Sequence, residues 1–134
     1  MKIVCDTNVL VSGILFGGHA RQILLLASRG RLTNFISDDM LHEAKDVLSR
    51  PKFKLTSQQV NAIIALFRDT FELVTPTRQH KVILSDPDDD RILEAADEAR
   101  ADIIVSGDKH LRSLELWRGI RILSPSEFVM EIED

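Results

Sequence analysis

The chain has 134 residues, of which 44% are hydrophobic and 28% charged, and its 17 basic and 21 acidic side chains give a formal net charge of −4. This length suits one domain over residues 1–134, and no apolar run approaches the roughly 20 residues that cross a bilayer, which excludes a membrane protein. The net charge excludes a general attraction for nucleic acid, although two bound divalent cations would bring it to about zero.

The N-terminal segment begins with a lysine and an apolar stretch, as a secretory signal does. Asp6 and Asn8 interrupt that stretch and no small-residue cleavage site follows, so we expect a cytoplasmic protein. Cys5 is the single cysteine and cannot form an internal disulfide. Its apolar neighbours predict a buried, unreactive thiol.

Short apolar runs alternate with amphipathic segments in the first part of the chain. Residues 2–5 form an apolar run suited to a strand that is buried on both faces, and the polar residues 6–8 end it. Residues 19–29 carry apolar side chains at helical spacing, and Gly30 is placed to end that helix in a left-handed conformation. Residues 32–36 are the second predicted strand.

Two helices with capping signals follow this strand. Ser37 or Asp38 can cap a helix that Pro51 must stop. Thr56 and Gln59 have the spacing of a capping box ahead of the next apolar-periodic segment.

The second part of the chain continues the alternation. The expected elements are a strand at 72–74, a helix opened by the acidic run 86–90, a strand at 102–105, a short helical stretch at 111–114, a strand at 120–123 and a final helix with a capping box at 124–127. Short strands that alternate with helices imply right-handed crossovers. We therefore expect an α/β fold in which helices cover both faces of a central parallel sheet of about five strands.

Two acidic residues directly follow predicted strands. Asp6 follows the first strand, and Asp108 follows the fourth after a Ser-Gly turn. In open parallel sheets, ligands bind beyond the carboxyl ends of the strands where the strand order reverses. Helices that start after such strands point their N-termini at the same edge, and two of them carry Glu43 and the acidic run 86–90. Four acids from distant parts of the chain are thus expected to converge.

Carboxylates in one place repel one another unless a cation compensates their charge. Mg²⁺ and Mn²⁺ prefer oxygen ligands and combine a few carboxylates with waters and phosphate oxygens. Such an ion lowers the pKa of a bound water and neutralises charge on a leaving oxygen. Hydrolysis of a phosphodiester bond is therefore the expected chemistry.

These acidic motifs resemble the PIN-domain family. The likeness rests on residues 3–10, the isolated Glu43, residues 86–93 and residues 106–109, in the family's order over almost the whole chain. It is nearest to toxins of the VapC type, which are small ribonucleases of toxin–antitoxin systems. The resemblance implies a three-layer α/β/α sandwich, Mg²⁺- or Mn²⁺-dependent endonucleolytic cleavage of single-stranded or structured RNA, a homodimer and inhibition by a protein antitoxin.

The resemblance also implies which residues form the site. Carried over residue by residue, it assigns the catalytic and metal-binding roles to Asp6, Glu43, Asp90 and Asp108. It gives supporting positions to Asn8 and Ser106.

The acidic run leaves one choice open. Helical spacing puts Asp89 nearest the packing side of its helix, whereas the family pattern of an aspartate three residues before an aliphatic residue favours Asp90. We choose Asp90 because a ligand at a helix N-terminus need not share the packing face. Asp86 and Asp88 are interpreted as caps.

Other signals are weaker than the acidic pattern. The basic residues that can contact RNA phosphates are Lys52, Lys54 and Lys109, with Arg50 and Arg112 near them in the sequence. The four histidines show no zinc-ligand spacing and receive no role.

Two other functions remain open. A phosphatase of the haloacid dehalogenase type would use Asp6 as a covalent nucleophile, but such enzymes normally carry a second aspartate two residues on, where this chain has Asn8. A non-catalytic module for RNA or a partner protein would keep the fold without the chemistry, and the presence of all four acids argues against it. The apolar segment 23–27 fits either a partner groove or the core.

Overall fold

The computed structural model describes residues 1–77 and 87–133. In this part of the chain, six strands form one sheet in the order β3-β2-β1-β4-β6-β5. They are β1 (Lys2–Cys5), β2 (Thr33–Ile36), β3 (Glu72–Leu73), β4 (Ile103–Val105), β5 (Leu116–Trp117) and β6 (Ile120–Leu123). The first four and β6 are parallel, as the sequence predicts, and β5 pairs antiparallel with β6.

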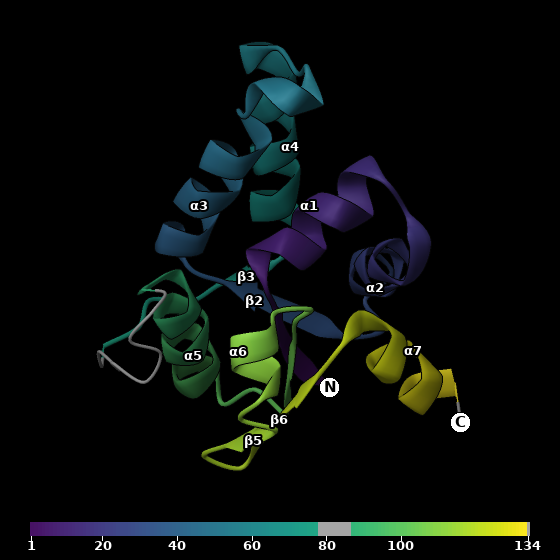
Figure 1. Ribbon diagram of the computed structural model, residues 1–134, viewed down its shortest axis with the longest axis vertical. Coiled ribbons are helices and arrows are strands. Elements are labelled where there is room, and N and C mark those ends of the chain that lie inside the picture. The colour runs from purple at the N-terminus through teal and green to yellow at the C-terminus, as the bar shows by residue number, and fades with distance from the viewer. Residues whose placement is uncertain (78–86, 134) are drawn as a thin grey trace.

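Helices cover both faces of the sheet. They are α1 (Thr7–Leu15), α2 (Gly18–Ser28), α3 (Asp38–Leu48), α4 (Ser57–Thr70), α5 (Pro87–Ala99), α6 (Lys109–Arg112) and α7 (Pro125–Glu133), with a 3₁₀ turn η1 at Pro51–Phe53. Helices α2 and α7 pack against each other on one side of the sheet, and α5 and α6 lie on the other (Figure 1). The predicted three-layer α/β architecture is therefore confirmed.

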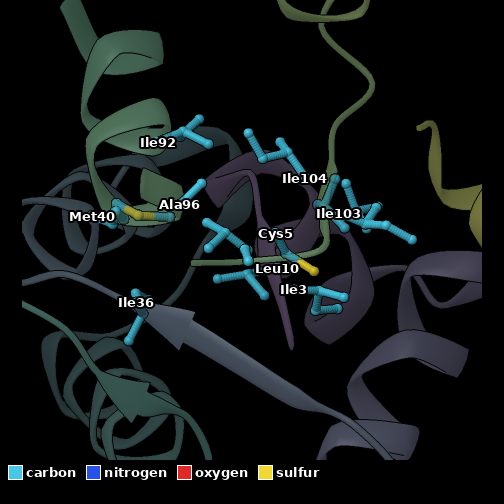
Figure 2. Packing of buried hydrophobic residues seen from close by; sticks show 14 of the residues in the cluster. Ile3, Cys5, Leu10, Ile36, Met40, Ile92, Ala96, Ile103 and Ile104 are labelled. Carbon is cyan, nitrogen blue, oxygen red and sulfur yellow. The ribbon is translucent and has the colours of Figure 1, made fainter. Parts of the chain in front are cut away.

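The two central strands, β1 and β4, are buried on both faces. They pair in register over three residues, so that Ile3 lies beside Ile103 and Cys5 beside Val105. Helical side chains meet this layer, and Figure 2 shows four of them: Leu10, Met40, Ile92 and Ala96. Strands covered on both faces need apolar side chains at successive positions, which explains the uninterrupted apolar runs in the sequence.

The direction of the chain across the sheet reverses at β1. From β1 the chain moves to β2 and β3 on one side, and it then returns to place β4 and β6 on the other side. Ligand crevices in such sheets form outside the carboxyl ends of the two strands where this reversal occurs, which here are β1 and β4.

Capping side chains begin the helices where the sequence predicts them. Ser37 caps α3, so the cap is Ser37 and not Asp38. Thr56 and Gln59 form both hydrogen bonds of a capping box at the start of α4. Gly30 follows α2 with φ of +70°, the left-handed conformation that its position predicts.

Helix α1 is absent from the sequence prediction, which has residues 6–8 only ending a strand. It was missed because the helix is buried around most of its circumference, including Val9, Leu10 and Val11. Its polar positions that are not buried, Asn8 and Ser12, are too few to mark a clear period, and its valines are more typical of strands. The sixth strand, β5, was missed because its two residues lie between charged residues and no longer apolar run marks it.

Two interpretations from the sequence fall on the undescribed segment. Asp86 lies outside the described residues and the side chain of Asp88 is not described, so their capping role stays a prediction. Within residues 1–77 and 87–133, no single helix is long and apolar enough to cross a membrane; α1 and α2 meet that criterion only as a pair bent by 97°.

Candidate functional site

Asp6 lies at the carboxyl end of β1 and caps α1. It is 3% exposed, and its Oδ1 accepts the backbone N–H of Asn8 at 3.0 Å. The N–H of Asp6 donates to the carbonyl of Val105 at 2.8 Å, which ties the end of β1 to the end of β4. The carboxylate is thus fixed at the reversal point of the sheet.

Ser106 connects Asp6 with Asp108. Its buried hydroxyl donates to Asp6 Oδ2 at 2.7 Å and accepts the N–H of Asp108 at 3.0 Å. A serine hydroxyl has one proton to donate and two lone pairs, so both contacts can form at once. Ser106 therefore orients one acid and holds the backbone of the other.

Asp108 caps α6 and faces the same hollow as Asp6. Its Oδ1 accepts the N–H of His110 at 2.7 Å and that of Leu111 at 3.2 Å. The hollow has a volume of about 350 Å³ and is lined by Asp6, Asn8, Val9, Ser12, Ala20, Gly107, Asp108 and Pro125. Two of the predicted site acids therefore share one wall.

Glu43 lies on α3 and contacts the residue next to Asp6. It is half-buried, and its Oε2 accepts the hydroxyl of Thr7 at 3.1 Å. Thr7 is fully buried and follows Asp6 directly. Sequence reasoning missed Thr7, although a hydroxyl residue in the first helical turn beside a site acid was a signal that could have revealed it.

Asp89 and Asp90 are both buried in the first turns of α5, at 4% and 6% exposure. Burial therefore does not separate the two candidates. The next residue, Arg91, donates to the buried Glu94. That hydrogen bond raises the pKa of Arg91 above its ordinary value, and the charges of Glu94, Asp39 and Asp90 add to the effect against the opposing influence of burial.

The fit of these acids to a divalent cation rests on Asp6 and Asp108. In the described part of the chain, no three aspartate, glutamate, histidine or cysteine side chains lie close enough together to hold one ion. The structure thus pairs Asp6 with Asp108, joins Glu43 to the neighbour of Asp6, and does not gather all four acids. A pair of carboxylates is the protein contribution that Mg²⁺ commonly uses, with waters and phosphate oxygens completing its shell.

The predicted basic RNA contacts lie in two places. Lys109 begins α6, next to Asp108, and is exposed. Lys52 and Lys54 are exposed in and after η1, where the turn between α3 and α4 projects away from the sheet (Figure 1). The structure therefore brings Lys109 alone of these three to the edge that carries Asp6 and Asp108.

The family of the chain follows from its sequence and agrees with this architecture. The model of the PIN-domain family matches residues 2–110, so the chain belongs to the PIN-domain family. The resemblance described from the motifs is thereby confirmed.

One solved structure has a similar fold. It is the crystal structure of VapBC2 from Rickettsia felis bound to a DNA fragment from their promoter, one chain of which aligns with a TM-score of 0.65 and 18% identity over 91% of this chain and 97% of that chain. At this identity the likeness concerns the fold alone. No curated protein matches the chain.

Proposed function

We propose that this PIN-domain protein is a metal-dependent endoribonuclease that hydrolyses RNA phosphodiester bonds at the hollow between Asp6 and Asp108. The observation that carries the proposal is the pair of hydrogen bonds by which Ser106 joins these two acids where the strand order reverses. An acid pair fixed beside an open hollow suits a reaction in which phosphate charge must be compensated. The proposal treats residues 1–134 as one catalytic domain.

Asp6 and Asp108 would hold Mg²⁺ or Mn²⁺, and Glu43 and Asp90 are the further acids that we assign to the same centre. A bound ion supplies positive charge for the phosphate oxygens and acidity for a water molecule. Asn8 and Ser106 keep both oxygens of Asp6 in place by hydrogen bonds. These contacts give the Asp6 carboxylate a defined orientation before a cation binds.

Hydrolysis forms a bond between a water oxygen and phosphorus and breaks the bond from phosphorus to the leaving ribose oxygen. The proton of the water must pass to a base, and the leaving oxygen must gain one. We assign the first step to Glu43, whose Oε2 accepts the hydroxyl of Thr7, the residue next to Asp6. Solvent supplies the proton to the leaving oxygen.

The test is cleavage of a labelled structured RNA in Mn²⁺ by the wild-type chain and by Asp6→Asn. The substitution keeps the shape and an acceptor for Asn8 but removes the charge, so we expect cleavage to fall by about 100-fold or more. Asp69→Asn is the matched control. Because Asp69 is exposed on α4, this variant should cleave RNA as the wild type does. Equal cleavage by Asp6→Asn and wild type would refute the proposed site.

A non-catalytic module for RNA or a partner is the second candidate. The observation in its favour is that no three metal-ligating side chains of the described residues gather into one group. Calorimetry separates the candidates: if Mn²⁺ shows no binding that Asp108→Asn or Asp90→Asn weakens, the non-catalytic function replaces the enzymatic one.

We further propose a protein antitoxin as partner, since the VapBC2 structure has a similar fold. An apolar hollow of about 240 Å³ between α1, α2 and α4 offers a place for an apolar helix, and Leu25 and Leu66 are exposed there. Of the segment 23–27, Ile23 is buried in the core, whereas Leu24 and Leu25 line this hollow. A short upstream reading frame for a DNA-binding protein that co-purifies with the chain supports the proposal, and a lone gene contradicts it.

A further inference from the structure

A second polar hollow has Glu43 in its wall. It is open, has a volume of about 610 Å³, and is lined by Asp39, His42, Glu43, Asp46, Val47, Arg50 and Arg91. Glu43 also accepts the hydroxyl of Thr7, the residue next to Asp6, so a hydrogen bond links the wall of this hollow to the proposed site.

Arg91 is the cation of this hollow that the fold holds in a fixed position. Its Nη1 contacts Glu94 Oε1 at 2.5 Å, and the side chain of Glu94 is 4% exposed while that of Arg91 is 36% exposed. The ion pair compensates part of the cost of burying the charge of Glu94, which favours keeping the guanidinium beside it. The long side chain of Arg91 is therefore ordered before any ligand arrives, which reduces the entropy lost on binding.

The charges around the hollow indicate that Arg91 compensates negative charge there. Among the lining residues, Asp39, Glu43 and Asp46 are acidic, and Arg50 and Arg91 are the cations. A phosphate that approaches three carboxylates is repelled unless a cation lies beside it. The guanidinium carries five N–H donors in a planar fork that fits phosphate oxygens, and its contact with Glu94 employs Nη1.

We propose that Arg91 binds a backbone phosphate of the RNA next to the cleaved bond, and that Glu94 is the residue that positions it. The inference rests on the proposed nuclease function and names the contact by which substrate is held on the α3 side. Sequence reasoning missed Arg91 because an arginine within an acidic helix start suggests only a surface charge.

The experiment measures binding of a fluorescent single-stranded RNA to Asp6→Asn and to Asp6→Asn combined with Arg91→Ala, over a series of salt concentrations. We expect about 10-fold weaker binding on loss of Arg91, as for other hydrogen bonds to charged groups, and a salt dependence shallower by about one counterion. In the cleaving protein, Arg91→Ala should raise KM more than it lowers kcat. Arg31→Ala is the control, since exposed Arg31 precedes β2 at the opposite edge of the sheet and should change neither value.

Two further variants test the same role of Arg91 even if Arg91→Ala fails to fold. Arg91→Gln removes the charge but can still donate to Glu94, so it serves if Arg91→Ala does not fold. Glu94→Gln keeps Arg91 but weakens its anchor, and it should weaken RNA binding less than loss of Arg91 does.

Failure of the inference differs from failure of the proposed function. If the wild type cleaves RNA and Arg91→Ala and Arg91→Gln match its KM and salt dependence, the role of Arg91 is overturned and the nuclease stands. If the wild type does not cleave RNA in Mn²⁺, the nuclease proposal is overturned instead.

Discussion

Ser106 is the residue on which the geometry of the candidate site depends most. Its hydroxyl is buried and serves two partners, one on each of the acids that share the hollow. Removal of a buried hydrogen-bonding group leaves its partners to bear the cost of desolvation, about 1–3 kcal/mol. The hydroxyl oxygen of Ser106 thus contributes to the stability of the fold at the carboxyl ends of β1 and β4 and also orients Asp6.

Ser106→Ala should lower the free energy of unfolding by about 1–3 kcal/mol and also lower RNA cleavage. Urea denaturation and the cleavage assay measure the two effects on the same samples. Ser113→Ala is the matched control: Ser113 is exposed and its hydroxyl donates to the carbonyl of His110, so its loss should cost less than about 0.5 kcal/mol. Similar losses of stability in both variants would contradict the special role of Ser106.

At the scale of single residues, the sequence reveals some site positions and hides others. Asp6 and Asp108 are recognisable because each follows an apolar run that forms a central strand. The contacts of Thr7 and Arg91 are not recognisable, because they depend on which helices become neighbours and on the burial of Glu94. Position along the chain therefore predicts the acids, whereas their partners require the fold.

At the scale of elements, the close approach of α1 and α2 depends on Gly13. A Cβ atom at this position would lie 2.7 Å from Leu24 Cδ1 and 3.0 Å from the backbone of Ala20. Arg21 strengthens the same contact, because its guanidinium donates to the carbonyls of Gly13 and Ile14 at 2.9 Å. These carbonyls lie near the C-terminus of α1, where a positive charge is favourable.

Gly13→Ala should lower the free energy of unfolding by about 1–3 kcal/mol, since the two helices must move apart. The usual gain from alanine in a helix, about 1 kcal/mol, is smaller than this cost. Thermal and chemical unfolding check the result. Gly107→Ala is the control: no atom lies within 4 Å of an added Cβ there, so the free energy of unfolding should stay unchanged or rise slightly. If Gly13→Ala unfolds with the same free energy as the wild type, tight packing of α1 on α2 is disproved.

The elements themselves were predictable where burial leaves a periodic pattern. β1 and β4 appear as apolar runs, and α4 shows its capping box directly in the sequence. Helix α1 shows no clear period because most of its circumference is buried and its valines are typical of strands. The order of the strands is not readable from the chain either, because adjacency of β1 and β4 joins segments about 100 residues apart.

At the scale of the whole molecule, Cys5 reports on complete unfolding. The thiol lies in β1 between β2 and β4, and burial, with a smaller contribution from the charge of Asp6, raises its pKa. The side chain of a strand residue projects from a face of the sheet, so access to this thiol requires the helices over that face to move away, and local opening of the sheet edges does not expose it. The buried, unreactive cysteine that the sequence predicts agrees with its position.

Native protein should therefore resist alkylation of Cys5 by iodoacetamide, and the alkylation rate should rise with urea in parallel with global unfolding. Mass spectrometry measures the modified fraction over time. Ser113→Cys in a Cys5→Ala background provides an exposed thiol that should react at once without urea. Rapid labelling of Cys5 in the native protein would show that the centre of the sheet opens locally.

The hydrogen bond from Ser106 to Asp6 joins two residues that are 100 positions apart. A ribosome releases the chain from its N-terminus, so Asp6, Thr7 and Glu43 leave the exit tunnel long before Ser106 and Asp108 do. A nascent chain cannot close the hollow until residue 108 has emerged, and a product truncated before that residue never can. If the proposed nuclease function holds, translation itself thus delays cleavage of RNA, including the message being read, until most of the chain has been synthesised.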